Sequence, residues 1–69
     1  MKNKLRELRK NQKLTQEELA NLIGISRQAI NAIEKEKFDP SLPTAFKMSK
    51  LFEIAIGELF FFEGSNKLN

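Results

Sequence analysis

The sequence contains no cysteine and no histidine, and only three of its 69 residues are glycine and two are proline. Without cysteine there is neither a disulfide framework nor a thiolate zinc site. Without histidine the chain lacks the usual general base and the commonest metal ligand. No long apolar run follows the basic segment MKNKLRELRK, so we expect neither a signal peptide nor a membrane anchor. These absences predict a cytoplasmic protein that needs no metal or cofactor.

Apolar residues make up 41% of the chain and charged residues 30%, which is typical of a globular protein. A chain of this length forms one domain, residues 1–69, with a modest core. Its net charge of +3 is unevenly distributed, because residues 1–37 hold nine Lys and Arg against five Glu, whereas residues 38–69 hold three Lys against four acids. The basic half suits the phosphates of a nucleic acid, although a merely solvated basic surface would have the same composition.

Residues 16–35, QEELANLIGISRQAINAIEK, predict two short helices around a tight turn. Thr15 and Glu18 have the spacing of a capping box at the start of the first helix, which we expect over Gln16 to Ile23. Gly24 can end that helix in a left-handed conformation, and Ser26 can cap the next helix. Leu19, Ala20 and Ile23 supply the apolar stripe of the first helix.

The second of these helices, from Arg27 to Lys35, carries Ile30 and Ile33 on one side and polar residues on the other. Arg can pair with guanine through two hydrogen bonds, and Gln or Asn with adenine, so such a face suits the major groove of DNA. This polar face alone would fit an ordinary helical hairpin with a solvated face equally well. A helix-turn-helix with a recognition helix is favoured because its tight crossing needs a small residue and a turn glycine. The residues with these offsets are Ala20, Gly24, Ile25, Ile30 and Ile33.

The text LRELRKNQKLTQEELANLIGISRQAINAIEKEKFDPSLPTAFKMSKLFEI, followed by GELF, covers about residues 5–60. This text resembles the phage-repressor, Cro-like (XRE-type) family of helix-turn-helix transcriptional regulators, and especially small members similar to cytolysin-regulator-like repressors. The resemblance implies an all-α, five-helix lambda-repressor-like bundle. It also implies a homodimer that binds double-stranded DNA in the major groove of a two-fold operator.

The resemblance assigns DNA-contact roles to eight positions and a structural role to one pair. Gln16 is expected to bond a phosphate and to brace the recognition helix, while Ala32 could touch only a thymine methyl group. The positions expected to contact DNA are Gln16, Ser26, Arg27, Gln28, Asn31, Ala32, Lys35 and Lys37. Arg9 and Glu34 are expected to join the first helix to the end of the third.

The remaining segments predict the other helices. The first helix should run from Asn3 or Lys4 to about Asn11, and the fourth from Leu42 to Phe52 with Ser41 as its cap. Phe38, in the connection from the third helix to the fourth, could pack on DNA sugars or anchor its loop against the core. The apolar side of the fourth helix is expected to consist of Leu42, Ala45, Phe46, Met48 or Ser49, and Phe52.

The fifth helix, expected over about Ile56 to Phe60, departs from the family pattern. Glu53 and Ala55 replace the usual left-handed terminator and helix cap, and Gly57 lies inside the helix.

Residues 59–63, LFFFE, could add a short strand that pairs with residues near 1–3. Phe61 or Phe62 should be exposed in a monomer, since neighbouring strand residues face opposite ways; alternatively, both rings fold back onto the core. We expect a dimerisation segment over about residues 54–63, with Ile56, Leu59, Phe60, Phe61 and Phe62 at the dimer interface.

These patterns favour a sequence-specific DNA-binding regulator, acting as a repressor by occupying its operator. An antitoxin-like protein with a second protein partner is a variant of this function. A helical protein-interaction module without DNA binding is the alternative class, but the polar and basic recognition helix argues against it. An enzyme is not expected, because histidine, cysteine and an evident pair of carboxylates are missing.

Overall fold

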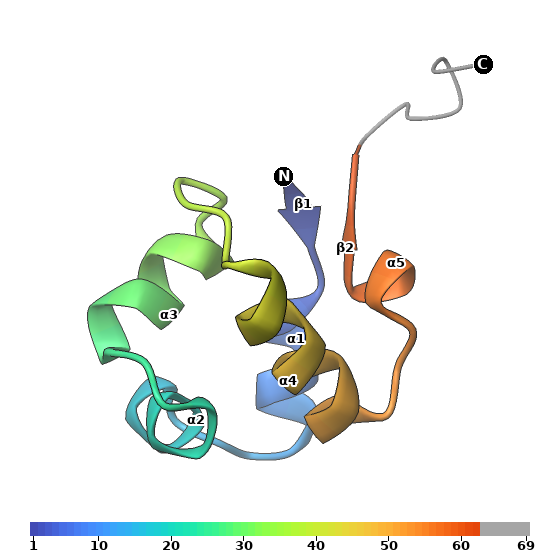
Figure 1. Ribbon diagram of the computed structural model, residues 1–69. Helices are drawn as coiled ribbons and strands as arrows, with labels where there is room; N and C mark the ends of the chain where they lie inside the picture. The colour runs from blue at the N-terminus through green and yellow to red at the C-terminus, as the bar shows by residue number, and fades with distance from the viewer. Residues whose placement is uncertain (63–69) are drawn as a thin grey trace, which may run out of the picture.

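The computed structural model describes residues 1–62. Five helices and two short strands follow one another in the order β1 (Lys2–Asn3), α1 (Leu5–Asn11), α2 (Gln16–Ile23), α3 (Arg27–Glu34), α4 (Leu42–Phe52), α5 (Ile56–Leu59) and β2 (Phe60–Phe61). In Figure 1, α2 and α3 lie at one end of the molecule and α5 with the two strands at the other. The five-helix bundle implied by the sequence resemblance is confirmed, together with the short C-terminal strand.

The α2–α3 unit is defined by local interactions at its turn. The Thr15 hydroxyl accepts a hydrogen bond from the Glu18 backbone at 3.0 Å, and the Glu18 carboxylate accepts one from the Thr15 backbone at 2.8 Å, so the expected capping box is present. Gly24 ends α2 at φ 91°, and a Cβ there would meet nothing within 4 Å. Backbone conformation therefore accounts for this glycine, and steric space does not. Ser26 then caps α3 by accepting a bond from the Ala29 backbone at 3.0 Å.

The core lies where all five helices meet. Six of its side chains are essentially inaccessible to solvent: Leu5, Leu19, Ile30, Ile33, Met48 and Leu59. Leu8 and Leu14 pack against this core from α1 and the turn that follows it. Packing of this kind supplies most of the stability of helices as short as these.

Helix α4 is only partly covered by its neighbours. Ser41 caps it through the Thr44 backbone, and its bounds agree with the predicted ones. Ala45, Met48 and Phe52 face the core as expected, with Met48 and not Ser49 at the centre. The placement of Leu42 and Phe46 on the buried side was wrong, because these side chains are 64% and 54% exposed. Within residues 1–62, no other element covers that stripe of α4.

The C-terminal end of the described chain returns to the N-terminus. Glu53 adopts the left-handed conformation (φ 55°, ψ 46°) usually taken by glycine or asparagine, and Ala55 provides no side-chain cap for α5. Strand β2 then pairs antiparallel with β1, with Lys2 opposite Phe61 and Asn3 opposite Phe60. Helix α1 consequently begins at Leu5, later than expected, because Asn3 belongs to the sheet. Helix α5 ends at Leu59, one residue earlier than expected, because Phe60 belongs to β2.

The structure also differs from the sequence-based expectation at the end of α3 and bears on the position of Phe38. Helix α3 ends at Glu34, and Lys35 is its C-cap instead of its last residue. Phe38 is 55% exposed, so its ring is not buried in the core. Residue 63 of the expected dimerisation segment lies outside the described residues, as do residues 64–69, GSNKLN, whose short polar sequence predicts no more than a tail. Within residues 1–62, no helix is both long and apolar enough to cross a bilayer.

Candidate nucleic-acid interface

Helix α3 has two chemically opposite sides. Ile30 and Ile33 are buried in the core, at 0% and 1% exposure, and they fix the helix against α2. On the other side, Arg27, Gln28 and Lys35 are exposed and Asn31 is half-buried; we call these four residues the polar face of α3. Such a face offers hydrogen-bond donors of the kind that pair with base edges and phosphates.

A buried ion pair holds α3 against α1. Arg9 Nε donates to Glu34 Oε2 at 2.7 Å, and Arg9 Nη2 donates to Glu34 Oε1 at 3.3 Å, which gives the two-pronged geometry of a strong pair. Arg9 Nη1 also donates to the Leu14 carbonyl at 2.7 Å. The side chains are only 10% and 3% exposed. The pair implied by the family resemblance therefore lies in a largely desolvated position, where its loss would be costly.

Gln16 connects this ion pair to the polar face of α3. Its Nε2 donates to Glu34 Oε1 at 3.1 Å and to Asn31 Oδ1 at 3.2 Å. Both protons of the Gln16 amide are thus used inside the protein. Gln16 therefore braces α3, and a bond from its side chain to a phosphate would require it to leave one of these partners.

The start of α2 offers other groups to a phosphate. The backbone N–H groups of Gln16 and Glu17 occupy the first turn of the helix, where no intrahelical partner exists. Such groups bind anions well. Beside them is a polar groove of about 200 Å³, lined by Arg6, Arg9, Gln16, Asn31, Glu34 and Lys35. Arg6 was missed at the sequence level, although its position three residues before Arg9 places both on one side of α1.

The other predicted contact residues surround the polar face of α3 without forming a single cluster. Ser26 is exposed at the start of the helix, and its hydroxyl oxygen serves as the cap. Ala32 is half-buried, so only part of its methyl surface is available to a base. Lys37 is exposed in the turn after α3, and its backbone N–H donates to the Ala32 carbonyl at 3.0 Å.

The comparisons with known proteins agree with this geometry. A family model described as helix-turn-helix matches residues 5–59. An uncharacterized HTH-type transcriptional regulator from Methanocaldococcus jannaschii is 54% identical over 63 residues, covering 91% of this chain and 96% of the relative. The cryptic phage CTXphi transcriptional repressor RstR of Vibrio cholerae is 40% identical over 57 residues, covering 83% of this chain and 51% of RstR.

A solved structure has the same fold. The restriction-modification controller protein C.AhdI from Aeromonas hydrophila superimposes with a TM-score of 0.73 at 37% identity, covering 83% of this chain and 86% of that protein. The chain therefore belongs to the helix-turn-helix family of transcriptional regulators, of the XRE, Cro-like type. Its relatives in this family are DNA-binding regulators and not enzymes.

Proposed function

We propose that this protein is a sequence-specific repressor that binds a two-fold operator as a homodimer in the cytoplasm. The observation that carries the proposal is the polar face of α3, which is held in place from behind by the Arg9–Glu34 pair and Gln16. A recognition helix that is fixed in this way can enter the major groove without the free-energy cost of rearranging its own side chains. The similarity to a phage repressor supports repression over activation.

Each part of the surface has a distinct role in this proposal. Arg27 and Gln28, exposed in the first turn of α3, contact base edges. Lys35, Lys37 and the backbone N–H groups at the start of α2 contact phosphates on either side. In this proposal, repression follows from occupation of the operator.

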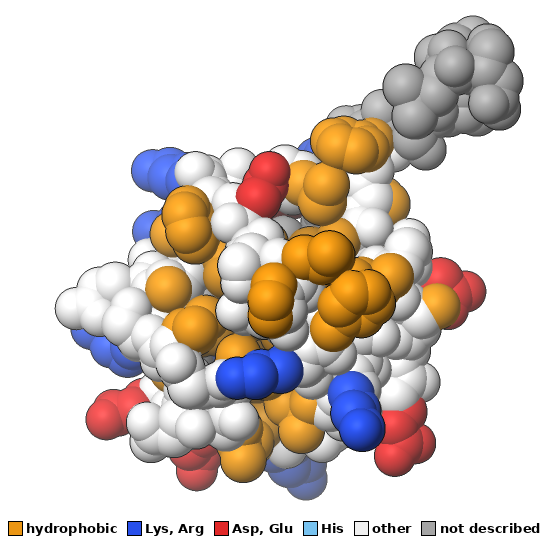
Figure 2. Space-filling model, viewed as in Figure 1, with side chains coloured by type: hydrophobic (Ala, Val, Ile, Leu, Met, Phe, Trp, Pro, Cys, Tyr) orange, Lys and Arg blue, Asp and Glu red, His pale blue; other side chains and the backbone are white. Residues whose placement is uncertain are grey.

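The homodimer surface that we propose is the apolar side of α4 together with α5 and β2. Figure 2 shows hydrophobic side chains gathered over this face. Leu42 and Phe46 lie one turn apart on α4 and are 64% and 54% exposed, and Phe62, directly after β2, is 58% exposed. Exposed apolar groups in one contiguous patch are typical of protein interfaces.

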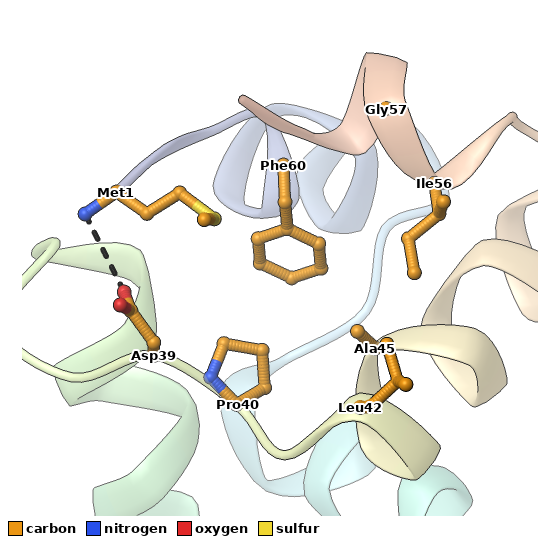
Figure 3. A pocket seen from close by; sticks show the side chains of 8 residues that line it. All are labelled: Met1, Asp39, Pro40, Leu42, Ala45, Ile56, Gly57 and Phe60. Carbon is orange, nitrogen blue, oxygen red and sulfur yellow. Dashed lines mark ion pairs between the residues drawn. The ribbon is translucent and has the colours of Figure 1, made fainter. Parts of the chain in front are cut away.

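A groove of about 290 Å³ lies within the same face, lined by Met1, Asp39, Pro40, Leu42, Ala45, Ile56, Gly57 and Phe60. In Figure 3 these side chains surround a common space, and the Met1 amino group forms an ion pair with Asp39 at 3.4 Å at one edge. Ile56 and Phe61 are half-buried, whereas Leu59 and Phe60 belong to the core at 0% and 8% exposure. Leu59 and Phe60 would thus support the interface from beneath, and Leu42 and Phe46 add contacts that the sequence pattern had assigned to the core.

Selection of bound fragments from genomic DNA, at two salt concentrations, tests the DNA-binding proposal. We expect an inverted repeat whose half-sites are about 34 Å apart, one helical turn. Binding that is sequence-independent and falls steeply with salt would contradict it, because that behaviour arises from phosphate attraction alone.

Sedimentation equilibrium of matched variants tests the homodimer. Phe46→Ser and Phe62→Ser should each shift the protein toward monomer. Leu22→Ser is the control, because Leu22 is also 59% exposed but lies on α2 in a different groove. A dimer that survives both phenylalanine changes, or that dissociates only with Leu22→Ser, would exclude the proposed surface.

A further inference from the structure

The groove on the proposed homodimer surface suits a single apolar side chain. Its walls come from the start of α4, from α5 and from β2, and the side chains that line its interior are apolar. Among the lining residues, charge is confined to the Met1 amino group and the Asp39 carboxylate, which pair with each other at one edge. A volume of about 290 Å³ is small for a ligand pocket. One aromatic ring that enters such a pocket is a typical anchor of a protein–protein interface.

Gly57 keeps one wall of this groove open. It lies inside α5, where glycine is less favourable than alanine. Within residues 1–62 nothing requires a glycine there, because its backbone is not left-handed and a Cβ would meet nothing within 4 Å. In Figure 3 the side chains of Ile56 and Phe60 point into the groove beside Gly57, which adds none. The missing side chain therefore leaves room for a group from outside the protomer.

Phe62 is an aromatic residue on the same face that its own protomer leaves uncovered. It is 58% exposed and is not among the residues that line the groove. Side chains alternate along an extended chain, so Phe62 is placed on the side of Phe60, which lines the groove, and Phe61 is placed on the other side. The ring of Phe62 therefore lies beside the groove and projects from the same surface.

Phe46, the other exposed ring on this face, has a different position. It follows Leu42 by one turn of α4, and Leu42 lines the groove. Phe46 thus stands at the rim of its own protomer's groove. Phe62 instead lies beyond the last pair of the two-stranded sheet, Lys2 with Phe61, at the end of an extended segment. This position allows the ring of Phe62 to reach a neighbouring molecule.

We propose that the groove of each protomer receives Phe62 of the partner subunit. This inference rests on the proposed homodimer and names the contact that holds it together. A two-fold dimer uses the same patch on both protomers, so a contact between Phe62 and the groove is made twice. Each ring leaves water and packs on the open wall at Gly57, opposite Pro40.

Two substitutions remove the two halves of this contact. Phe62→Ser removes the ring, whereas Gly57→Leu fills the groove and gives α5 a better helix former. In the trans heterodimer, one protomer carries Phe62→Ser and the other carries Gly57→Leu, so one ring still meets one open groove. In the cis heterodimer, one protomer carries both substitutions and the other carries neither, so no ring meets an open groove.

Native mass spectrometry of the mixed proteins measures the dissociation constants, because the chains differ in mass. Both heterodimers contain the same two substitutions, so general effects on hydrophobicity or on α5 cancel. The trans heterodimer should have a dissociation constant at least about tenfold lower than the cis heterodimer, since it retains one aromatic anchor. Equal dissociation constants would overturn the proposal, because contact between the two Phe62 rings across the axis gives no advantage to the trans arrangement.

A second pair of heterodimers tests which ring enters the groove. With Phe46→Ser in place of Phe62→Ser, the trans and cis heterodimers each keep one ring in one open groove, so their dissociation constants should agree. A trans advantage with Phe46→Ser and none with Phe62→Ser would overturn the assignment of the ring. Gly57→Ala, which fills less of the groove, should give a smaller trans advantage with Phe62→Ser, and it serves if Gly57→Leu does not fold.

Failure of the homodimer and failure of this contact give different results. If the unmodified protein stays monomeric at every concentration, the proposed homodimer fails and this contact fails with it. If the unmodified protein dimerises but the trans and cis heterodimers are equally stable, the homodimer stands and the exchange of Phe62 is refuted.

Discussion

Replacing either partner of the Arg9–Glu34 pair should destabilise the protein far more than replacing both. In Glu34→Met, the Arg9 guanidinium stays in a position where only 10% of its side chain is exposed, and it loses both bonds to the carboxylate. In Arg9→Met, the Glu34 carboxylate, whose side chain is 3% exposed, retains only Gln16. Breaking a buried pair from one side costs about 3–5 kcal/mol.

The double variant Arg9→Met/Glu34→Met leaves no unpaired charge. The methionine side chains fill much of the same space. The remaining cost is that of the Leu14 carbonyl, which loses its bond to Arg9, and of the Gln16 amide, which loses its bond to Glu34. An unsatisfied buried acceptor costs about 1–3 kcal/mol. We therefore expect the double variant to be more stable than either single variant, with a coupling of several kcal/mol between the two sites.

Urea unfolding followed by circular dichroism measures these differences. A protein of this size has a total stability of about 3–10 kcal/mol, so single variants can be largely unfolded at 25 °C. Measurements near the temperature of maximum stability, about 10–20 °C, keep them within range. A loss of under about 1 kcal/mol in both single variants would refute the reasoning, because that is the behaviour of a solvated surface pair.

Three smaller stability effects follow from the helix ends, and urea unfolding of dilute protein measures each. Ala55→Ser should stabilise by about 1 kcal/mol, because Ala55 has the extended N-cap backbone and Glu58 stands three residues later. Gly57→Ala should stabilise by about 0.5–1 kcal/mol, since its Cβ would meet nothing within 4 Å. Ser26→Ala should destabilise by about 1 kcal/mol through loss of the α3 cap. Effects of opposite sign would contradict these assignments.

Local chemistry explains why α2 and α4 could be bounded correctly from the sequence. Thr15 with Glu18, Gly24, and Ser41 are signals that act within a few residues, and each adopts the conformation that its chemistry favours. The start of α1 could not be predicted in the same way. It depends on the pairing of Asn3 with Phe60, a contact between the two ends of the described chain.

Apolar periodicity failed for α4 for a different reason. The pattern identifies which side chains are apolar, but it does not reveal whether a neighbouring element covers them. Leu42 and Phe46 share a helix with Ala45 and Met48, yet only the latter two are buried in the core. Which apolar side chains of α4 stay exposed depends on where the other helices and strands lie, and the periodicity of one helix does not contain that information.

The polar face of α3 was predictable by residue type, but its internal connections were not. Arg27, Gln28 and Asn31 follow from the polar side of an amphipathic helix, and the family resemblance implied the Arg9–Glu34 pair. The two bonds of Gln16 join positions 15 and 18 residues away in the sequence. No local pattern encodes them.

The central claim is that α3 recognises DNA sequence, and base-pair substitution combined with Arg27→Ala tests it most directly. Arg27 is exposed at the start of α3, so its loss should reduce affinity for the operator by about 1–3 kcal/mol and remove discrimination at one base pair. Lys50→Ala is the control for charge, since Lys50 is an exposed cation on α4. Arg27→Ala, and not Lys50→Ala, should abolish the preference for one base at one position of the operator. Equal loss of affinity for operator and random DNA would contradict it.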